Sequence, residues 1–402
     1  MKASRGLRLH IALLGRRNVG KSSLLNALTR QDVSIVSTEA GTTTDPVEKP
    51  MELLPLGPVL FIDTAGIDDE GALGAQRVAR THRVLDRTDL GLVIFTGAAW
   101  GSFEDELVAA LAERGAPVLA VANQVDLQPV PPELMVKLRA AGLVVVSTSA
   151  TRGDGLPELR EALLESAPGD FVNAPPLLHD LVPPGEVAVL VIPVDKEAPK
   201  GRIILPQVQA IRDLLDHDAL ALVVQDRGLA GALASLGRPP ALVVTDSQAF
   251  SRVAELTPET VPMTSFSILM ARHRGDLQTQ AAGALAIDGL RSGDRVLVAE
   301  SCTHHPIEED IGRVKLPGWI RERSGAELAF DTVAGRDFPD DLSPYRLVIQ
   351  CGGCMTNRRE VLSRILRCRE AGVPITNYGV AIAHCLGILE RALAPFRLRN
   401  SE

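Results

Sequence analysis

Eight residues close to the N-terminus, 15–22, have the types and spacing of a phosphate-binding loop. Gly15 and Gly20 flank four residues, and Lys21 and Ser22 follow. Glycines let backbone N–H groups turn inward around phosphate oxygens, and a helix N-terminus adds partial positive charge. Lys21 is expected to reach the β- and γ-phosphates, and the Ser22 hydroxyl to ligate Mg²⁺. The spacing therefore predicts a nucleoside triphosphate site.

The sequence around this loop predicts the elements that must position it. An apolar run over 9–14 predicts a buried strand, and leucines at helical spacing after the loop predict a helix. Strand, loop and helix in this order are the context that the motif requires. Asn18, Val19 and Ser23 complete the predicted loop contacts to the nucleotide.

Two further segments are expected to respond to the third phosphate. In the hydroxyl-rich segment 40–46 we expect Thr43 to complete the Mg²⁺ shell, with Thr42 and Thr44 as alternatives. A Thr run on its own is also typical of a solvated turn. An apolar strand over 59–62 ends at Asp63, whose carboxylate can hold Mg²⁺ through water. The N–H of Gly66 can meet the γ-phosphate, which makes this glycine a hinge.

We assign Lys21, Thr43 and Gly66 to catalysis of phosphate transfer to water. The residue after Gly66 is Ile67, where Ras-like proteins have a glutamine that orients the attacking water. An aliphatic side chain cannot orient water. The expected intrinsic rate of hydrolysis is therefore low without another source of charge stabilisation.

Base selection is assigned to residues that follow two more apolar runs, 90–95 and 117–122. Asn123, Gln124 and Asp126 follow directly after the second run. An Asp carboxylate can accept both N1–H and N2–H of guanine, whereas adenine offers no such pair of donors. GTPases usually have Lys where Gln124 stands, and the aliphatic stem of that Lys packs on the base, so guanine affinity is expected to be weaker here.

A last predicted strand over 144–148 leads into Ser149 and Ala150, which fit the loop that backs the guanine. All five elements occur in order and at sensible spacing. The sequence therefore predicts binding of GTP and GDP rather than of adenine nucleotides.

This region resembles the Era and TrmE (MnmE) group of GTPases. The resemblance rests on the strings Gly-Arg-Arg-Asn-Val-Gly-Lys-Ser, Gly-Thr-Thr-Thr-Asp, Asp-Thr-Ala-Gly-Ile and Asn-Gln-Val-Asp. Relatives with Asn at the position of Asn18 are often activated by K⁺. The resemblance implies that Asn18 helps to bind K⁺ beside the phosphates, where the ion supplies positive charge. A simple turn-forming role is the alternative for this residue.

The composition predicts a globular chain of several domains. At 402 residues, with 46 % hydrophobic and 23 % charged residues, the chain is too long for one ordinary core. We predict three α/β domains, a P-loop GTPase domain over 1–170, a small dimerisation domain over 171–270 and a cluster-binding domain over 271–402.

The net charge and the hydropathy exclude some classes of partner. A net charge of −8 argues against a general binder of nucleic acids or anionic membranes. No apolar run approaches the ~20 residues that span a bilayer, and no cleavable signal is visible. We therefore expect a cytoplasmic protein with no nucleic-acid or membrane partner.

The middle region has the signals of a small α/β unit. Prolines at 175–176 and 183–184 indicate a linker. Three short apolar runs, 187–194, 220–225 and 241–245, predict strands, and 207–215 predicts a helix between them. No catalytic constellation is visible there, which by elimination favours a surface for homodimerisation.

The C-terminal region contains three cysteines that could converge. Cys302 follows an apolar run over 295–300, and Cys351 and Cys354 follow a second one over 346–350. The carboxyl ends of parallel strands lie at one edge of a sheet, where ligands bind. These thiols are therefore expected to lie together, with the glycines between the last two wrapping the chain around whatever they hold.

Three cysteines suit more than one metal. They fit a zinc site with a fourth ligand, a [4Fe-4S] cluster with one unusual iron, or reduced thiols without metal. Paired Cys-x-x-Cys knuckles are missing, which favours the cluster. The fourth ligand could be His304, His305 or Glu309. The two remaining cysteines, Cys368 and Cys385, lie in helical patterns typical of buried apolar residues.

The whole combination resembles the HydF family of [FeFe]-hydrogenase maturation GTPases. The supporting strings are Glu-Ser-Cys-Thr-His-His from residue 300, Glu-Glu-Asp-Ile-Gly-Arg from residue 308, and Gln-Cys-Gly-Gly-Cys from residue 350. The resemblance implies that the three cysteines bind a [4Fe-4S] cluster whose fourth iron is free or weakly ligated. It also implies a scaffold that carries a diiron precursor to the [FeFe]-hydrogenase apoprotein. Two radical-SAM maturases, HydE and HydG, are the implied suppliers of the pieces.

One position departs from the family pattern. A His often precedes the Cys-x-x-Cys, whereas Gln350 stands here. The fourth ligand is therefore expected at Glu309 or His304, and a carboxylate is a hard, exchangeable ligand on iron.

Two other functions compete with the scaffold. One is a zinc-bearing GTPase of the Era/TrmE type that acts in ribosome or tRNA metabolism, against which the acidic charge counts. The other is a structural assembly protein with vestigial hydrolysis, against which the complete phosphate and Mg²⁺ motifs count.

Overall fold

The computed structural model describes residues 5–29, 46–64, 83–172, 175–194, 203–301, 310–335 and 337–397. The chain divides into two compact units, residues 1–174 and residues 175–402. No helix in the described ranges is long and apolar enough to cross a membrane. Thr43, Gly66, Ile67, Cys302, His304, His305 and Glu309 lie outside the described residues.

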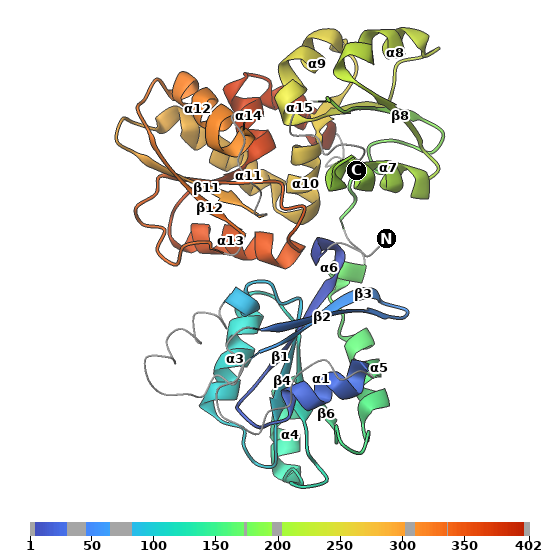
Figure 1. Ribbon diagram of the computed structural model, residues 1–402, viewed down its shortest axis with the longest axis vertical. Coiled ribbons are helices and arrows are strands. Elements are labelled where there is room, and N and C mark those ends of the chain that lie inside the picture. The colour runs from blue at the N-terminus through green and yellow to red at the C-terminus, as the bar shows by residue number, and fades with distance from the viewer. Residues whose placement is uncertain are drawn as a thin grey trace. The chain divides into compact units, whose positions relative to one another are not determined.

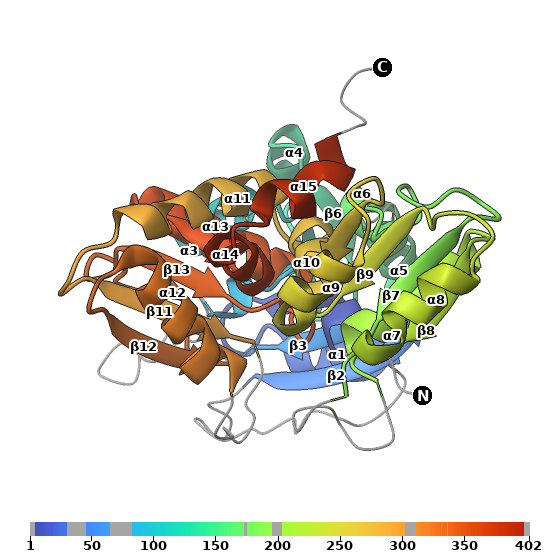
Figure 2. The ribbon, with the colours of Figure 1, turned by 90° about the horizontal axis from the view of Figure 1, so that it is seen from above.

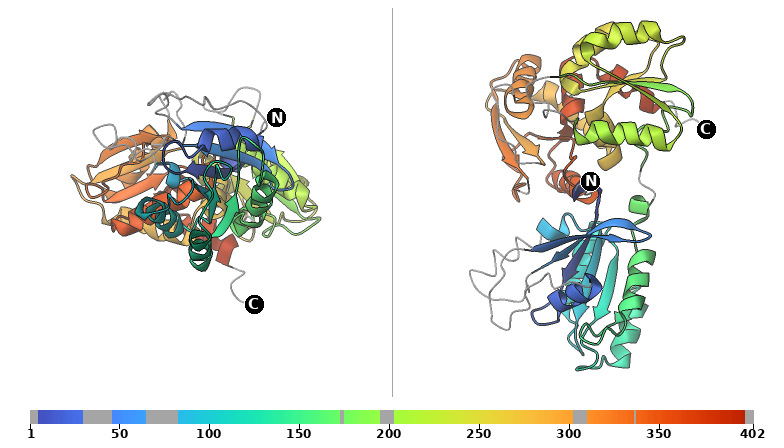
Figure 3. Two further views of the ribbon diagram at one scale, coloured as in Figure 1. Left: turned by 90° about the horizontal axis from the view of Figure 1, so that it is seen from below. Right: turned by 45° about the vertical axis from the view of Figure 1, so that its right-hand side comes forward.

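The first unit is built on a six-stranded sheet in the order β2-β3-β1-β4-β5-β6, in which only the β2–β3 pair is antiparallel. Helices lie on both faces, and Figure 3 shows the blue helix α1 beside the green helix α5. The elements are β1 (Leu9–Leu14), α1 (Lys21–Thr29), β2 (Val47–Leu53), β3 (Gly57–Asp63), β4 (Leu90–Phe95), α3 (Ser102–Glu113), β5 (Val118–Ala122), α4 (Pro132–Ala140), β6 (Val144–Ser147), α5 (Leu156–Glu165) and α6 (Gly169–Val172).

Strand β1 is buried on both faces because helices cover the sheet on both sides. Leu9, Ile11 and Leu13 pack against α1 and α5, whereas Ala12 and Leu14 pack against α3. Side chains of successive strand residues point to opposite faces, so the whole run must be apolar. The run predicted from the sequence over 9–14 matches this strand.

The second unit begins with a four-stranded parallel sheet in the order β10-β9-β7-β8. Figure 1 shows α8 and α9 on one side of this sheet and α7 and α10 on the other. The elements are β7 (Val187–Val191), α7 (Leu205–Asp216), β8 (Leu220–Val224), α8 (Leu229–Ser235), β9 (Leu242–Thr245), α9 (Phe250–Leu256), β10 (Met263–Ser265) and α10 (Phe266–Arg274).

A second four-stranded parallel sheet follows in the order β12-β11-β13-β14, and Figure 2 shows the first three of these strands side by side. Apolar clusters line both of its faces, one with α12 and α14 and the other with α13. The elements are α11 (Leu277–Ala284), β11 (Arg295–Glu300), α12 (Leu316–Ser324), β12 (Ala329–Ala334), β13 (Leu347–Gln350), α13 (Arg358–Glu370), β14 (Ile375–Asn377), α14 (Tyr378–Cys385) and α15 (Leu389–Arg397).

Helices α14 and α15, which follow the second sheet in the chain, pack on the first sheet. Val380 of α14 and Leu393 of α15 join the cluster that contains Val189 and Val243 of the first sheet. Arg391 of α15 donates hydrogen bonds to the carbonyl oxygens of residues 254, 257 and 258. Helix α15 thus packs on the sheet that contains β7. The division that we predicted between 171–270 and 271–402 stays a prediction.

Glycine allows a close approach of helix α11 to strand β14. A Cβ added at Gly283 would lie 2.0 Å from the carbonyl oxygen of Ile375 and 2.6 Å from its carbonyl carbon. Backbone atoms of a buried strand cannot yield as a flexible side chain can. The helix can therefore reach this distance only through a residue without a side chain.

We expect Gly283→Ala to lower the free energy of unfolding by about 1–3 kcal/mol, because the added methyl group must push α11 away from β14. The matched control is Gly231→Ala in α8, where nothing lies within 4 Å of the added atom. There the helix propensity of Ala should raise stability by up to about 1 kcal/mol. Denaturant unfolding of the full chain measures both changes, and equal effects would contradict the close approach.

Candidate functional site

The phosphate loop connects β1 to α1 with the backbone that the motif predicts. Gly15 has φ 142° and Gly20 has φ 84°. A Cβ on Gly15 would lie 2.2 Å from the Ile94 carbonyl oxygen, and one on Gly20 would lie 2.4 Å from Nδ2 of Asn123. The backbone of strand β4 therefore requires glycine at position 15, and the buried Asn123 side chain requires it at position 20. Ser23, also predicted to contact the nucleotide, lies in the first turn of α1.

Lys21 is buried at the first position of α1. Its Nζ donates to the carbonyl oxygens of Gly15, at 2.9 Å, and of Arg16, at 2.6 Å. The ammonium group therefore lies across the loop. A positive charge at this place can neutralise phosphate oxygens that the loop N–H groups bind.

Ser22 and Asp63 come together as a pair that could hold Mg²⁺. The Ser22 Oγ donates to Oδ2 of Asp63 at 2.5 Å, although the residues are 41 positions apart. The parallel pairing of β1 with β3 causes this approach, since Leu13 lies in register with Asp63. Hydroxyl and carboxylate oxygens are the ligands that Mg²⁺ prefers.

Asn123 connects three loops from a fully buried position. Its Nδ2 donates to the Val19 carbonyl oxygen at 2.9 Å. Its Oδ1 accepts from the Thr148 hydroxyl at 3.1 Å and from the Ala150 N–H at 3.3 Å. A buried amide with these partners holds the phosphate loop and the loop after β6 in fixed relation.

Gln124 and Asn18 are linked where each adopts an uncommon backbone conformation. Gln124 has φ 57° and Asn18 has φ 61°, both in the left-handed region. The Gln124 Nε2 donates to the Asn18 carbonyl oxygen at 3.0 Å. The Asn18 side chain is exposed. It is therefore accessible to a ligand at the rim of the loop.

Asp126 presents an acceptor of the kind that guanine needs. Its Oδ1 is buried and makes no hydrogen bond within the described part of the chain. Hydrogen bonding to Ser149 lowers the pKa of Asp126, and the nearby Arg152 guanidinium, 3.7 Å away, acts in the same direction. The group is thus a carboxylate at neutral pH with a free lone pair, which fits the donor pair of a guanine edge.

An ion pair that the sequence analysis missed anchors the phosphate loop from α3. Arg16 contacts the fully buried carboxylate of Glu104 with two nitrogens, at 2.8 and 3.1 Å. The N–H of Gly101 donates to the same carboxylate at 2.9 Å, and the Arg16 guanidinium lies over the Phe103 ring. The signal in the sequence was a Glu three residues after a Gly that begins a helix, a spacing typical of helix capping.

In the second unit, the strand pairing brings Ser301 and Cys351 together. Ala299 lies in register with Gln350, so β11 and β13 end at the same edge. The N–H of Ser301 donates to Cys351 Sγ at 3.1 Å, and the Ser301 Oγ lies 3.2 Å from the same sulfur. Ser301 immediately precedes Cys302. Ser301, the neighbour of the predicted ligand Cys302, thus contacts the predicted ligand Cys351.

The loop after Cys351 depends on a glycine. Gly353 has φ 66°, which a residue with a side chain rarely adopts. Cys354 then packs beside the apolar cluster of β7 and α10. Both thiols are only partly buried. They remain accessible to a metal, and Ser301 supplies the kind of N–H donor that sulfur ligands of clusters accept.

A buried polar group lies beside this edge. The Tyr378 hydroxyl donates to Glu300 at 3.5 Å, and Arg313 lies 3.5 Å from the same carboxylate. Burial, and then the proximity of Cys351 and Glu300, raise the pKa of Tyr378 well above its ordinary value. Tyr378 therefore stays protonated as a donor.

The other two thiols have different surroundings. Burial raises the pKa of Cys368 to about 12 and the pKa of Cys385 to about 12. Thiols that stay protonated are poor metal ligands. This agrees with the expectation that both act as apolar residues.

Removing the charge of Glu104 tests the anchor of the phosphate loop. We expect Glu104→Gln to lower the free energy of unfolding by about 1–3 kcal/mol, because an amide donor would face Arg16 and Gly101. GTP affinity should fall as well. Glu106→Gln, at an exposed position of the same helix, is the control and should change neither quantity. Denaturant unfolding and nucleotide titration provide the measurements, and an unchanged Glu104→Gln variant would contradict the anchoring role.

Comparison with known proteins gives relatives for the first unit. The tRNA modification GTPase MnmE of Burkholderia ambifaria (strain MC40-6) is 39 % identical over 160 residues, which are 40 % of this chain and 34 % of the relative. MnmE of Synechococcus sp. (strain CC9311) is 40 % identical over 158 residues, 39 % of this chain and 34 % of the relative. The matches thus span about a third of the length of these curated relatives.

Solved structures match the chain at low overall similarity. An Era variant of Aquifex aeolicus bound to GDP and aluminium fluoride has a TM-score of 0.36 and 21 % identity, covering 64 % of this chain and 97 % of that chain. The G domain of the T. maritima FeoB iron transporter has a TM-score of 0.31 and 25 % identity, covering 40 % of this chain and 98 % of that chain.

Three family models match successive parts of the chain. A 50S ribosome-binding GTPase model matches residues 10–124. The hydrogen maturase F dimerization domain matches residues 177–275, and the hydrogen maturase F tetramerization domain matches residues 278–395. The last two together cover more than half of the 402 residues and follow a GTPase domain. The chain therefore belongs to the hydrogen maturase F (HydF) family of hydrogenase-maturation GTPases.

Proposed function

We propose that this GTPase is an iron–sulfur scaffold that carries a diiron precursor to the [FeFe]-hydrogenase apoprotein. The observation that carries the proposal is the 3.1 Å contact between the Ser301 N–H and Cys351 Sγ. It supports convergence of Cys302, Cys351 and Cys354 at one sheet edge of a chain that also has a complete GTP motif. The precursor is cargo that the protein binds and releases.

GTP is the substrate of the only reaction that we propose the chain to catalyse. Loop N–H groups and Lys21 would hold the phosphates, and Ser22 with Asp63 and Thr43 would hold Mg²⁺. Asp126 would select guanine. Gly66 would follow the third phosphate, so that hydrolysis changes the conformation of the segment around it.

Hydrolysis is proposed to be slow and stimulated by K⁺. Ile67 cannot orient the attacking water, so charge stabilisation must come from elsewhere. Asn18 has an exposed side chain at the rim of the phosphate loop, where its amide oxygen could ligate a monovalent cation. Such an ion would supply positive charge beside the phosphates.

The three cysteines are proposed to hold a [4Fe-4S] cluster. When bound, such a cluster offers one iron that the three thiolates do not ligate, where an exchangeable ligand can be replaced by cargo. Glu309 or His304 would be the exchangeable fourth ligand. Ser301 would donate its N–H to the Cys351 sulfur, and Glu300 with Tyr378 would keep a polar wall beside it.

Partners are proposed from the family and from one exposed surface. Apolar side chains on α7 and the edge strand β8 include Val208, Leu215, Leu220 and Val223, which are 43, 60, 54 and 45 % exposed. An apolar surface along a sheet edge suits a second copy of the chain. HydE, HydG and the hydrogenase apoprotein are the proposed partners for loading and delivery, in the cytoplasm. No nucleic acid is proposed as a partner.

We expect Asp126→Asn to weaken GTP binding on the order of 100-fold or more, because the negative charge is lost and one acceptor oxygen becomes an NH2 group that faces a guanine N–H. The matched control is Asp154→Asn, an exposed residue of the neighbouring loop that should leave the affinity unchanged. Titration with a fluorescent GTP analogue measures both. Equal affinity of the two variants would remove Asp126 from base recognition.

We expect Cys302→Ala, Cys351→Ala and Cys354→Ala each to lose iron and sulfide after anaerobic purification, while GTP hydrolysis persists. Cys385→Ala is the control, because its buried thiol should not ligate metal. Metal analysis and the visible spectrum provide the readout. Colourless wild-type protein without iron would contradict the cluster, and zinc that is lost in the three cysteine variants would favour a zinc-bearing GTPase.

A further inference from the structure

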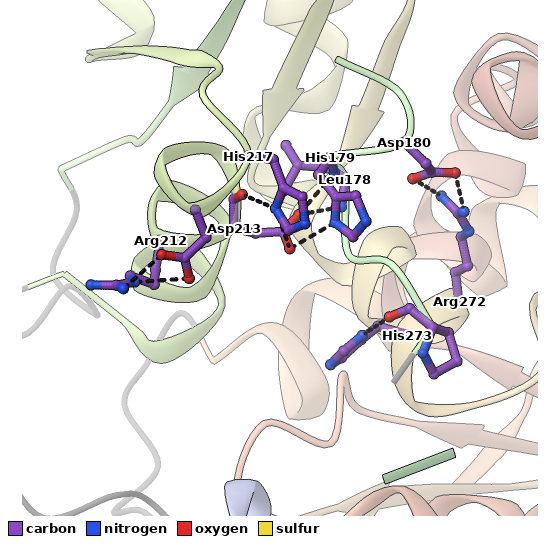
Figure 4. A network of polar contacts seen from close by, with 10 residues as sticks. Leu178, His179, Asp180, Arg212, Asp213, His217, Arg272 and His273 are labelled. Carbon is purple, nitrogen blue, oxygen red and sulfur yellow. Dashed lines mark hydrogen bonds and ion pairs between the residues drawn. The ribbon is translucent and has the colours of Figure 1, made fainter. Parts of the chain in front are cut away.

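Three potential metal ligands meet in the second unit, far from the cysteines in the sequence. His179 lies in the segment before β7, Asp213 lies in the last turn of α7, and His217 caps that helix. One ligand atom from each lies within 4.8 Å of the other two. Figure 4 shows the three side chains turned toward one another.

The carboxylate at the centre is held in one orientation. The Oδ2 of Asp213 accepts the backbone N–H groups of Leu178, at 2.9 Å, and of His179, at 2.8 Å. Its Oδ1 lies 3.0 Å from Nδ1 of His179 and 4.0 Å from Nδ1 of His217. The hydrogen bonds to Oδ2 thus fix the orientation of the carboxylate, and with it the position of Oδ1, which faces the two imidazoles.

The two imidazole rings stack on each other above this oxygen. Their centroids are 3.6 Å apart and their planes differ by 4°. The side chains of His179 and His217 are 29 and 44 % exposed, whereas that of Asp213 is 17 % exposed. The three side chains are therefore held by a partly buried carboxylate and are open to water on the side of the rings.

We propose that His179, Asp213 and His217 form a binding site for a divalent transition metal ion such as zinc. Two imidazole nitrogens and one carboxylate oxygen suit ions of borderline softness, whereas Mg²⁺ and Ca²⁺ prefer oxygen alone. Three protein ligands leave a coordination position for water, which the exposed side of the rings can supply.

The ion takes the place of a proton between His179 and Asp213. Zinc lies about 2.0–2.2 Å from nitrogen and oxygen ligands, which sets ligand atoms roughly 3.3 Å apart in a tetrahedral site. The pair from His179 and Asp213 is close to this spacing at 3.0 Å. The ring of His217 is 4.0 Å from the carboxylate and must swing out of the stack, because parallel rings cannot both aim a lone pair at one ion.

His217 is free to make this movement. It follows the last residue of α7, and among the described residues its Nδ1 contacts only the backbone oxygen of Asp213, at 2.8 Å, besides the carboxylate. Contacts that do not involve His179, Asp213 or His217 also hold the segment before β7. These are the ion pair of Asp180 with Arg272 and the hydrogen bond of His273 to the Pro175 carbonyl oxygen. Loss of the metal therefore need not unfold this region.

The test is zinc binding by the full-length chain in which Cys302, Cys351 and Cys354 are replaced by Ala, so that thiols cannot bind the probe. Equilibrium dialysis against Zn²⁺ followed by metal analysis counts the ions. We expect one zinc ion per chain, and at least a tenfold loss of affinity in His217→Gln and in Asp213→Asn. Because this background lacks the cysteines, the result is independent of the cluster proposal.

The matched control is Asp216→Asn, which alters an exposed carboxylate of the same helix that pairs with Arg212. It should keep the full affinity. Zinc should also raise the thermal unfolding midpoint of the control but not that of His217→Gln, a substitution at a half-exposed ring that the fold tolerates. The proposal would be wrong if the chain with only the three cysteine substitutions bound no zinc, or if all variants bound zinc equally.

Discussion

Hydrogen bonding between parallel strands is the constraint on which both candidate sites depend. In the first sheet, β1 aligns with β3, and the register places Asp63 beside Leu13 and within reach of Ser22. In the last sheet, β11 aligns with β13, which brings Ser301 against Cys351. Parallel strands end at a common edge, so residues separated by 41 or 50 positions meet without any direct sequence signal.

Buried polar groups then hold the loops that leave these edges. Asn123 contacts the phosphate loop and the loop after β6 from a position without solvent exposure. Glu104, also without solvent exposure, does the same for the phosphate loop from α3. The partly buried Asp213 holds the segment before β7. A buried carboxylate or amide is costly unless its partners are complete, so each of these groups restricts its loops to one arrangement.

Local signals in the sequence identified most of the elements that carry chemistry. The strands at 9–14 and 90–95 match the structure, because strands covered by helices on both faces are apolar at every position. The helix expected over 207–215 is observed as Leu205–Asp216. Strands β2 and β12 were missed, since their exposed residues interrupt the apolar pattern. Glu104 was missed as a functional residue because its partner, Arg16, lies 88 positions away.

The sequence by itself indicated the chemistry: the phosphate loop, the proposed role of Asp126 in selecting guanine, and the strands that end at cysteines all follow from residue types at short, fixed spacing. Only the tertiary structure decided which distant side chains meet, such as Ser301 with Cys351 or His179 with Asp213 and His217. It also decided that α15 returns to the sheet that contains β7. The reason is physical, because spacing along a helix or strand is set by local backbone geometry, whereas contacts between elements depend on how whole apolar faces pack.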